Sequence, residues 1–214
     1  MEEKFFKELI EKVQSYFENG GSHGFDHTER VLNLSLKISE EVKGIDLDVV
    51  KAAAILHDIA RLMEDKGKIS CHAEEGAKLA KEILEKTNFP REKIEKVCYS
   101  IKVHRHSSNI TPETKEAEIL QDADRLDALG AITIARMFST GGKMERPLYK
   151  PEIPFGDVKK GYDCDSTIHG FYGKILKIKP ETFKTAKAKK IAKHRYKIVE
   201  DFLTEFKKEW AGEL

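Results

Sequence analysis

Apolar residues recur at intervals of three and four along most of the chain, and this spacing is typical of amphipathic helices. The first such stretch carries Phe5, Leu9, Val13 and Phe17 on one face. Gly20 and Gly21 follow it and are expected to end the helix. No stretch alternates apolar and polar residues as a half-buried strand does. The pattern therefore predicts an all-α fold.

The same periodicity predicts further helices over residues 26–42, 46–58, 70–84, 94–103, 112–138, 166–176 and 182–210. Asp26 is suited to cap the first of these, and Glu29 three residues later would complete a capping box. Asp46 and Ser70 stand where caps of two later helices are expected. Each of these residues can accept a hydrogen bond from a backbone N–H at the start of a helix.

Residues 141–164 lack a helical period and are predicted to form a long loop. Gly141 and Gly142 are expected to end the preceding helix. A connection of this length is usually functional or disordered, and the sequence leaves open whether residues 147–161 close over a ligand. Residues 165–214 are predicted to form a C-terminal helical extension packed on the rest, within a single domain spanning residues 1–214.

Composition narrows the classes of partner. The 38 basic and 37 acidic residues nearly cancel, so global charge gives no reason to expect binding to nucleic acid or to a membrane. No stretch approaches the roughly 20 apolar residues of a membrane span. Cys71, Cys98 and Cys164 are odd in number and form no Cys-x-x-Cys pair, which favours a reduced, cytoplasmic protein. The sequence says nothing about oligomeric state.

An apolar run over residues 52–56 leads directly into His57 and Asp58. Two adjacent polar side chains at the end of such a segment are expected near the core, where their burial is costly unless both have partners. A divalent cation would satisfy both, because neutral His supplies a nitrogen ligand and Asp supplies an anionic oxygen. The alternative is a buried ion pair that caps a helix.

Two more residues extend this candidate site. His27 is expected in the first turn of a helix, and Asp124 interrupts an otherwise apolar helix face. With His57 and Asp58 they would offer two imidazole nitrogens and two carboxylates. This donor set suits Mn, Mg, Zn, Fe, Co or Ni, of which manganese is the first expectation. The alternative is a buried polar network without an ion.

The order His, His-Asp, Asp resembles that of the metal-dependent phosphohydrolases of the HD domain family, which is named after this dipeptide. Residues 122–130, 146–149 and 195–210 also resemble its small single-domain bacterial and archaeal members. The resemblance thus covers roughly residues 24–210. It implies the HD-domain helical bundle as the fold and His27, His57, Asp58 and Asp124 as the metal ligands.

Other polar residues are candidates for catalysis. The order of His72, His104 and His106 resembles that of the extra histidines with which two-metal HD phosphodiesterases bind a second ion, but Arg105 separates His104 from His106 where those enzymes pair histidines directly. Alternatively, these histidines donate to phosphate or act as a general acid, whereas His106 is expected at the surface. Asp127 lies one helical turn after Asp124, where it would orient a ligand or a water, or pair with an arginine. The candidate catalytic residues are Asp58, His72, His104 and Asp127.

Recognition of a polyphosphate requires fixed positive charge at close range. The candidate substrate-binding residues are Lys102, Arg105, Arg146, Lys174 and Arg195. Hydrolases of the guanosine alarmones resemble this chain in part, but they carry a Glu-Asp pair where Arg61 and Leu62 stand here. Hydrolysis of alarmones by that mechanism is therefore not expected.

The resemblance implies a metal-dependent phosphohydrolase that acts on a small phosphate ester or nucleotide through a metal-activated water. Related small members suggest cleavage of a triphosphate to a monophosphate and pyrophosphate. Two alternatives stay open. One is a phosphomonoesterase or cyclic phosphodiesterase, and the other is a non-catalytic helical regulatory module that binds the metal structurally.

Overall fold

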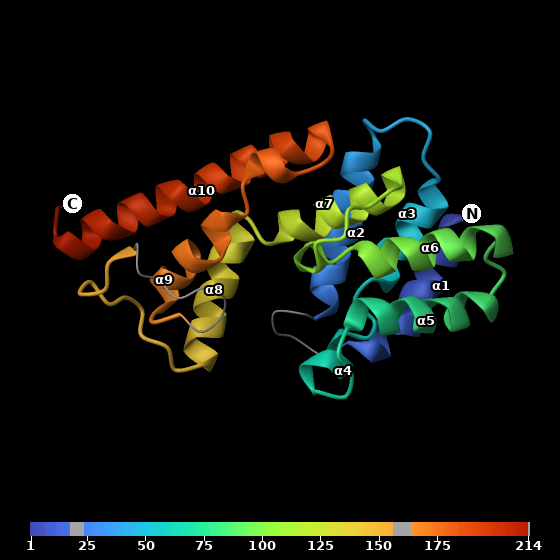
Figure 1. Ribbon diagram of the computed structural model, residues 1–214, viewed down its shortest axis with the longest axis horizontal. Helices are drawn as coiled ribbons and strands as arrows, with labels where there is room; N and C mark the ends of the chain where they lie inside the picture. Colours follow the sequence, from blue (N-terminus) through green and yellow to red (C-terminus); the bar gives the residue numbers. More distant parts are fainter. Residues whose placement is uncertain (18–23, 156–163, 214) are drawn as a thin grey trace. The chain divides into compact units, whose positions relative to one another are not determined.

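The computed structural model describes residues 1–17, 24–155 and 164–213 (Figure 1). Its regular secondary structure is helical, and the described residues contain no strand, which confirms the predicted all-α fold. The α-helices are α1 (Glu3–Val13), α2 (Phe25–Ser39), α3 (Leu47–Leu56), α4 (Arg61–Asp65), α5 (His72–Glu85), α6 (Arg91–Val103), α7 (Lys115–Asp127), α8 (Ala131–Lys143), α9 (Thr167–Gly173) and α10 (Ala186–Ala211). Short 3-10 turns are η1 (Gln14–Tyr16), η2 (His106–Ser108), η4 (Ile175–Lys177) and η5 (Pro180–Thr182). None of the helices in these ranges is both long and apolar enough to cross a membrane.

The described residues form two compact units, Met1–Asp124 and Arg125–Leu214, and the division falls inside α7. In the first unit α3 packs against α1, α2 and α6, and α5 packs against α6. In the second unit α8 packs against α9 and α10. The single domain expected over residues 1–214 stays a prediction.

The apolar helix α3 forms the centre of the first unit. Every residue from Ala52 to Leu56 is buried, as are Val49 and Val50. The three consecutive alanines give this helix a thin profile, so neighbouring helices can approach it from several sides. Asp46 caps it, because its carboxylate accepts hydrogen bonds from the backbone N–H groups of Asp48 and Val49. The helix thus leads His57 into a buried position.

Two of the predicted caps are wrong. Gly24 is the N-cap of α2, and Asp26 lies in the first turn, where its carboxylate pairs with Arg30 at 2.6 Å. Helix α5 begins at His72 after Cys71, so Ser70 does not cap it. The backbone N–H of His72 instead donates to the Glu64 carboxylate at 2.6 Å, and this contact replaces the cap.

Helix ends also differ from the prediction. Helix α1 stops at Val13, and Phe17 has extended backbone after a 3-10 turn. Gly20 and Gly21, the expected end of this helix, lie outside the described residues. Helix α8 continues through Gly141 and Gly142 to Lys143, so these glycines do not end it. The loop expected over 141–164 therefore begins after Lys143, and its residues 156–163 are not described.

The continuous helix predicted over residues 112–138 is wrong, because the chain breaks between α7 and α8 at Gly130. Its φ of 86° and ψ of −160° lie in a region that is almost restricted to glycine. A Cβ at this position would lie 3.1–3.4 Å from side-chain carbons of Arg195. The break is stabilised by Thr133, whose hydroxyl donates to the Asp127 carbonyl at 3.0 Å.

Substitution Gly130→Ala is expected to lower the free energy of unfolding by about 1–3 kcal/mol, the cost of holding alanine in this backbone region. In a protein of this size the melting temperature would fall by roughly 2–4 °C for each kcal/mol. Gly142→Ala is the matched control, because Gly142 is helical and no described residue outside its own helix lies within 4 Å of the position that a Cβ would take. That variant should be about 0.5–1 kcal/mol more stable. Equal melting temperatures for the two variants would contradict this account.

Candidate metal centre

Six His and Asp side chains of the first unit gather into two clusters of possible metal ligands. One cluster contains His27, His57 and Asp124, and the other contains Asp58, His72 and His104. Within each cluster the potential ligand atoms lie within 4.8 Å of one another. Three of these residues stand at helix ends. His57 and His104 are the C-cap residues of α3 and α6, and His72 is the first residue of α5.

The first cluster is compact. His57 Nε2 lies 3.3 Å from His27 Nε2, which lies 3.3 Å from Asp124 Oδ1. Both histidines are buried, whereas the Asp124 side chain is 27% exposed. The cluster therefore combines two sheltered imidazoles with a carboxylate that solvent can reach.

Asp58 joins the two clusters. Its Oδ2 lies 3.7 Å from His27 Nε2 and 3.8 Å from His57 Nε2. Its Oδ1 lies 3.3 Å from His72 Nε2 and 3.7 Å from His104 Nε2. One carboxylate oxygen thus faces each cluster. The four ligands inferred from the sequence, together with His72 and His104, are brought into one region.

The hydrogen bonds of His57 decide which ring nitrogen carries its proton. Its Nδ1 is 2.8 Å from the Ala54 carbonyl, which can only accept, so Nδ1 carries the hydrogen. Neutral His57 then presents a bare lone pair at Nε2 towards His27 Nε2. A lone pair that close to other ligand atoms is stabilised by a cation or a proton between them. The donor set and its protonation therefore fit a divalent cation.

The same reasoning applies to the second cluster. His104 Nδ1 donates to the Ile101 carbonyl at 2.6 Å, and His72 Nδ1 donates to the Glu64 carboxylate. The two Nε2 atoms face each other at 3.4 Å. Two bare lone pairs would repel at this distance, so a proton or a cation is required here as well.

The pKa shifts differ between the clusters. Burial lowers the pKa of His57 to about 4, so this imidazole stays neutral as a metal ligand must. Burial also lowers the pKa of His72. For His104 burial acts in the same direction, but hydrogen bonding to Asp58 and the charges of Asp58 and Asp124 outweigh it and raise the pKa. Of these three histidines, His104 therefore holds a second proton most readily.

Both carboxylates of these clusters are ionised. Burial alone would raise the pKa of Asp58, but the neighbouring His57, His27 and His104 outweigh it and hold the pKa well below its usual value. Burial is likewise outweighed at Asp124, where the contact with His27 lowers the pKa. Two anionic ligands are thus available to a cation at ordinary pH.

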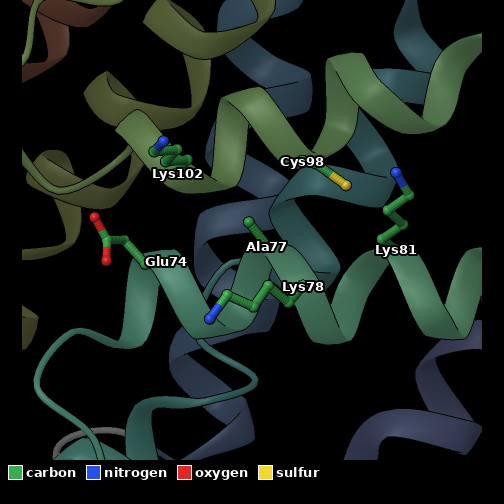
Figure 2. Close-up of a pocket in the computed structure, with 6 residues that line it drawn as sticks. All are labelled: Glu74, Ala77, Lys78, Lys81, Cys98 and Lys102. Carbon is green, nitrogen blue, oxygen red and sulfur yellow. The ribbon is translucent and has the colours of Figure 1, made fainter.

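Lys102, predicted to bind substrate, lies outside both clusters. It is exposed and lines a pocket of about 330 Å³ between α5 and α6, together with Glu74, Ala77, Lys78, Lys81 and Cys98 (Figure 2). Lys78 and Lys81 pair with Glu75 and Glu95, respectively. Burial raises the pKa of the Cys98 thiol to about 11, so it is not a thiolate nucleophile.

The other predicted residues occupy varied surroundings. Arg105 donates to Glu64 at 3.0 Å and to Ser107 at 2.9 Å, and His106 is exposed, as expected.

The second unit contains the remaining predicted residues, which are Asp127, Arg146, Lys174 and Arg195. There the buried Asp127 pairs with Arg136 at 2.9 Å, and Arg195 donates to the Leu126 carbonyl at 2.7 Å. Arg146 contacts the sulfur of Met144, and Lys174 is the C-cap residue of α9. The proposed roles of these residues stay predictions.

Glu64 is the functional candidate that the sequence reasoning missed. It contacts both the backbone and the ring of His72. Burial would raise its pKa, but these hydrogen bonds and the charge of Arg105 lower it to about 2. The available signal was the acidic pair Glu64 and Asp65, which follows the His-Asp dipeptide by a few residues.

Comparisons with known proteins identify a matching family and similar solved structures. The HD domain family matches residues 24–129. An HD-superfamily hydrolase from Bacillus thuringiensis is 33% identical with a TM-score of 0.76, over 97% of each chain. A predicted HD superfamily hydrolase from an uncultured Thermotogales bacterium is 32% identical with a TM-score of 0.68, over 95% of this chain and 92% of that one. Bacillus subtilis YpgQ, solved in complex with ADP, is 25% identical with a TM-score of 0.72, over 95% of this chain and 97% of that one.

Proposed function

This chain belongs to the HD superfamily of hydrolases, whose HD domain is a metal-dependent phosphohydrolase domain, and we propose that its substrate is a nucleotide. The favoured reaction is hydrolysis of a nucleoside triphosphate to the monophosphate and pyrophosphate. The complex of the related YpgQ with ADP supports a nucleotide as the class of substrate. The nucleotide substrate is thus inferred from the metal-dependent phosphohydrolase chemistry of the family and from the similarity to YpgQ.

The observation that carries this proposal is the convergence of two imidazoles and two carboxylates in the first unit. We propose His27, His57, Asp58 and Asp124 as the ligands of a divalent cation, with manganese as the first candidate. Such a cation, when bound, would neutralise phosphate charge and activate a water for attack on phosphorus. The partly exposed Asp124 leaves this ligand set accessible from solvent.

We propose that the second cluster, which contains Asp58, His72 and His104, donates a proton during the reaction. His104 holds a proton more readily than His57 or His72, and its Nε2 lies 3.4 Å from His72 Nε2. A proton held between these imidazoles would be available to the oxygen that leaves phosphorus, which is general acid catalysis. Burial of both rings keeps bulk water away from this proton.

A cyclic phosphodiesterase is the second candidate. The specific observation in its favour is the cluster of Asp58, His72 and His104, which offers a donor set for a second cation. Asp58 would then be a ligand common to both cations. A phosphomonoesterase and a metal-binding module without catalysis are the remaining alternatives.

A nucleotide panel assayed with added Mn²⁺ tests these alternatives. We expect pyrophosphate and nucleoside monophosphate from triphosphates, with phosphate and pyrophosphate measured separately. Release of phosphate from monophosphates would favour a phosphomonoesterase, and opening of cyclic nucleotides a phosphodiesterase. No turnover with any of Mn, Mg, Zn, Fe, Co or Ni would contradict an enzymatic role on these substrates.

A further inference from the structure

Glu64 lies near the end of the short helix α4 and accepts hydrogen bonds from three directions. Its Oε2 accepts the backbone N–H of His72 at 2.6 Å and the ring Nδ1–H of the same residue. Its Oε1 accepts from Arg105 Nη1 at 3.0 Å. The side chain is only 18% exposed. Both carboxylate oxygens of Glu64 therefore accept hydrogen bonds, although Glu64 belongs to neither of the two clusters found among the described residues.

The contact with the ring determines what His72 presents to the site. A neutral imidazole has one N–H, and a carboxylate at Nδ1 places the hydrogen there. The lone pair of Nε2 then faces Asp58 Oδ1 at 3.3 Å and His104 Nε2 at 3.4 Å. The additional bond to the backbone N–H fixes the position of the same residue at a second point. Both the tautomer and the orientation of His72 thus depend on one carboxylate.

The contact with Arg105 extends this effect to the other histidine of the cluster. Arg105 directly follows His104, which is the C-cap residue of α6, whereas His72 begins α5. The Glu64 carboxylate consequently links the start of α5 to the end of α6. These are the two segments that supply the facing imidazoles.

We propose that Glu64 is a positioning residue, which orders the pair His72 and His104 by fixing the tautomer and orientation of His72. This inference rests on the proposed function for its catalytic consequence, but not for its structural content. Carboxylates that orient a functional histidine through its second ring nitrogen typically contribute 10–100-fold to affinity or activity. The expected loss falls on kcat, because Glu64 would act on the reaction through the ring of His72.

The test compares Glu64→Ala with Glu64→Gln, and with Asp65→Ala as the matched control on the same helix. Asp65 pairs with Arg61 at 3.1 Å on the exposed side of α4. We expect kcat to fall about 10–100-fold in Glu64→Ala with KM changed by less than about twofold. Glu64→Gln keeps an oxygen that can accept from His72 and should recover most of this loss. Asp65→Ala should match the unmodified protein.

Nuclear magnetic resonance of ¹⁵N-labelled histidines provides a readout that is independent of turnover. In the metal-free protein the His72 ring should be the Nδ1–H tautomer, in Glu64→Ala it should become a mixture, and in Glu64→Gln it should stay Nδ1–H. A pure Nδ1–H form in Glu64→Ala, or an equal loss of kcat in Glu64→Ala and Asp65→Ala, would overturn the proposal. If no nucleotide is hydrolysed, the proposed function fails while the tautomer measurement still decides the role of Glu64.

Discussion

Replacing Asp58 with alanine is expected to lower kcat/KM by at least about 10³-fold, which corresponds to several kcal/mol of transition-state stabilisation. The reason is geometric. One oxygen of Asp58 faces His27 and His57, and the other faces His72 and His104, so a single substitution removes an anionic donor from both clusters. Steady-state kinetics with the best substrate of the nucleotide panel, together with isothermal titration by Mn²⁺, would measure the two losses.

Asp58→Asn and Asp201→Ala complete this experiment. Asparagine keeps the size of the side chain but not its charge, so it should retain the helical circular dichroism spectrum and lose metal binding. Asp201 is an exposed residue of α10 that pairs with Lys197, and its substitution should leave both measurements unchanged. Full activity of Asp58→Ala at full metal occupancy would show that the ligand assignment is wrong.

The helical periodicity predicted α1, α2, α5 and α6 of the first unit, because each of them buries residues at helical spacing. The apolar stretch ahead of His57 indicated a buried imidazole, and His57 is fully buried at the end of α3. Local chemistry also predicted the cap at Asp46. The residues of the first cluster gave different signals: His57 ends an apolar run, His27 stands in the first turn of an expected helix, and Asp124 interrupts an apolar face.

Features that depend on distant contacts were not predicted. Ser70 was expected to cap α5. Instead, the backbone N–H of His72 donates to the carboxylate of Glu64, which lies on α4 eight residues earlier in the chain. The break at Gly130 was not predicted because apolar residues continue at helical spacing around it. That pattern does not reveal the backbone conformation of the glycine. The approach of His104 to His72 depends on how α5 packs against α6, and a spacing of 32 residues gives no information about it.

The charges in the first unit give a reason to expect that metal binding stabilises it. Asp58 and Asp124 are held ionised by their histidine neighbours, while burial lowers the pKa of His57 and keeps it neutral. Two anionic carboxylates and a neutral imidazole are therefore available to the same cation. A divalent cation would compensate both charges at once, so metal binding and the stability of the first unit should be coupled.

Removing the metal with a chelator is therefore expected to abolish turnover and to lower the melting temperature. A ligand present at 100 times its dissociation constant stabilises the folded state by about 2.7 kcal/mol. For a chain of this size, that corresponds to a shift of roughly 5–10 °C. Differential scanning calorimetry of the chelator-treated protein, before and after addition of Mn, Mg, Zn, Fe, Co or Ni, would measure the shift and rank the metals.

The variant His57→Gln separates this coupling from nonspecific effects of the metal. It removes one nitrogen donor from the first cluster while leaving the surface of the protein unchanged, since His57 is fully buried. Its melting temperature should be nearly independent of added metal, and its turnover should not return after the chelator is removed. A metal-dependent shift of the same size in this variant would place the cation elsewhere, because stabilisation by a bound ion requires its ligands.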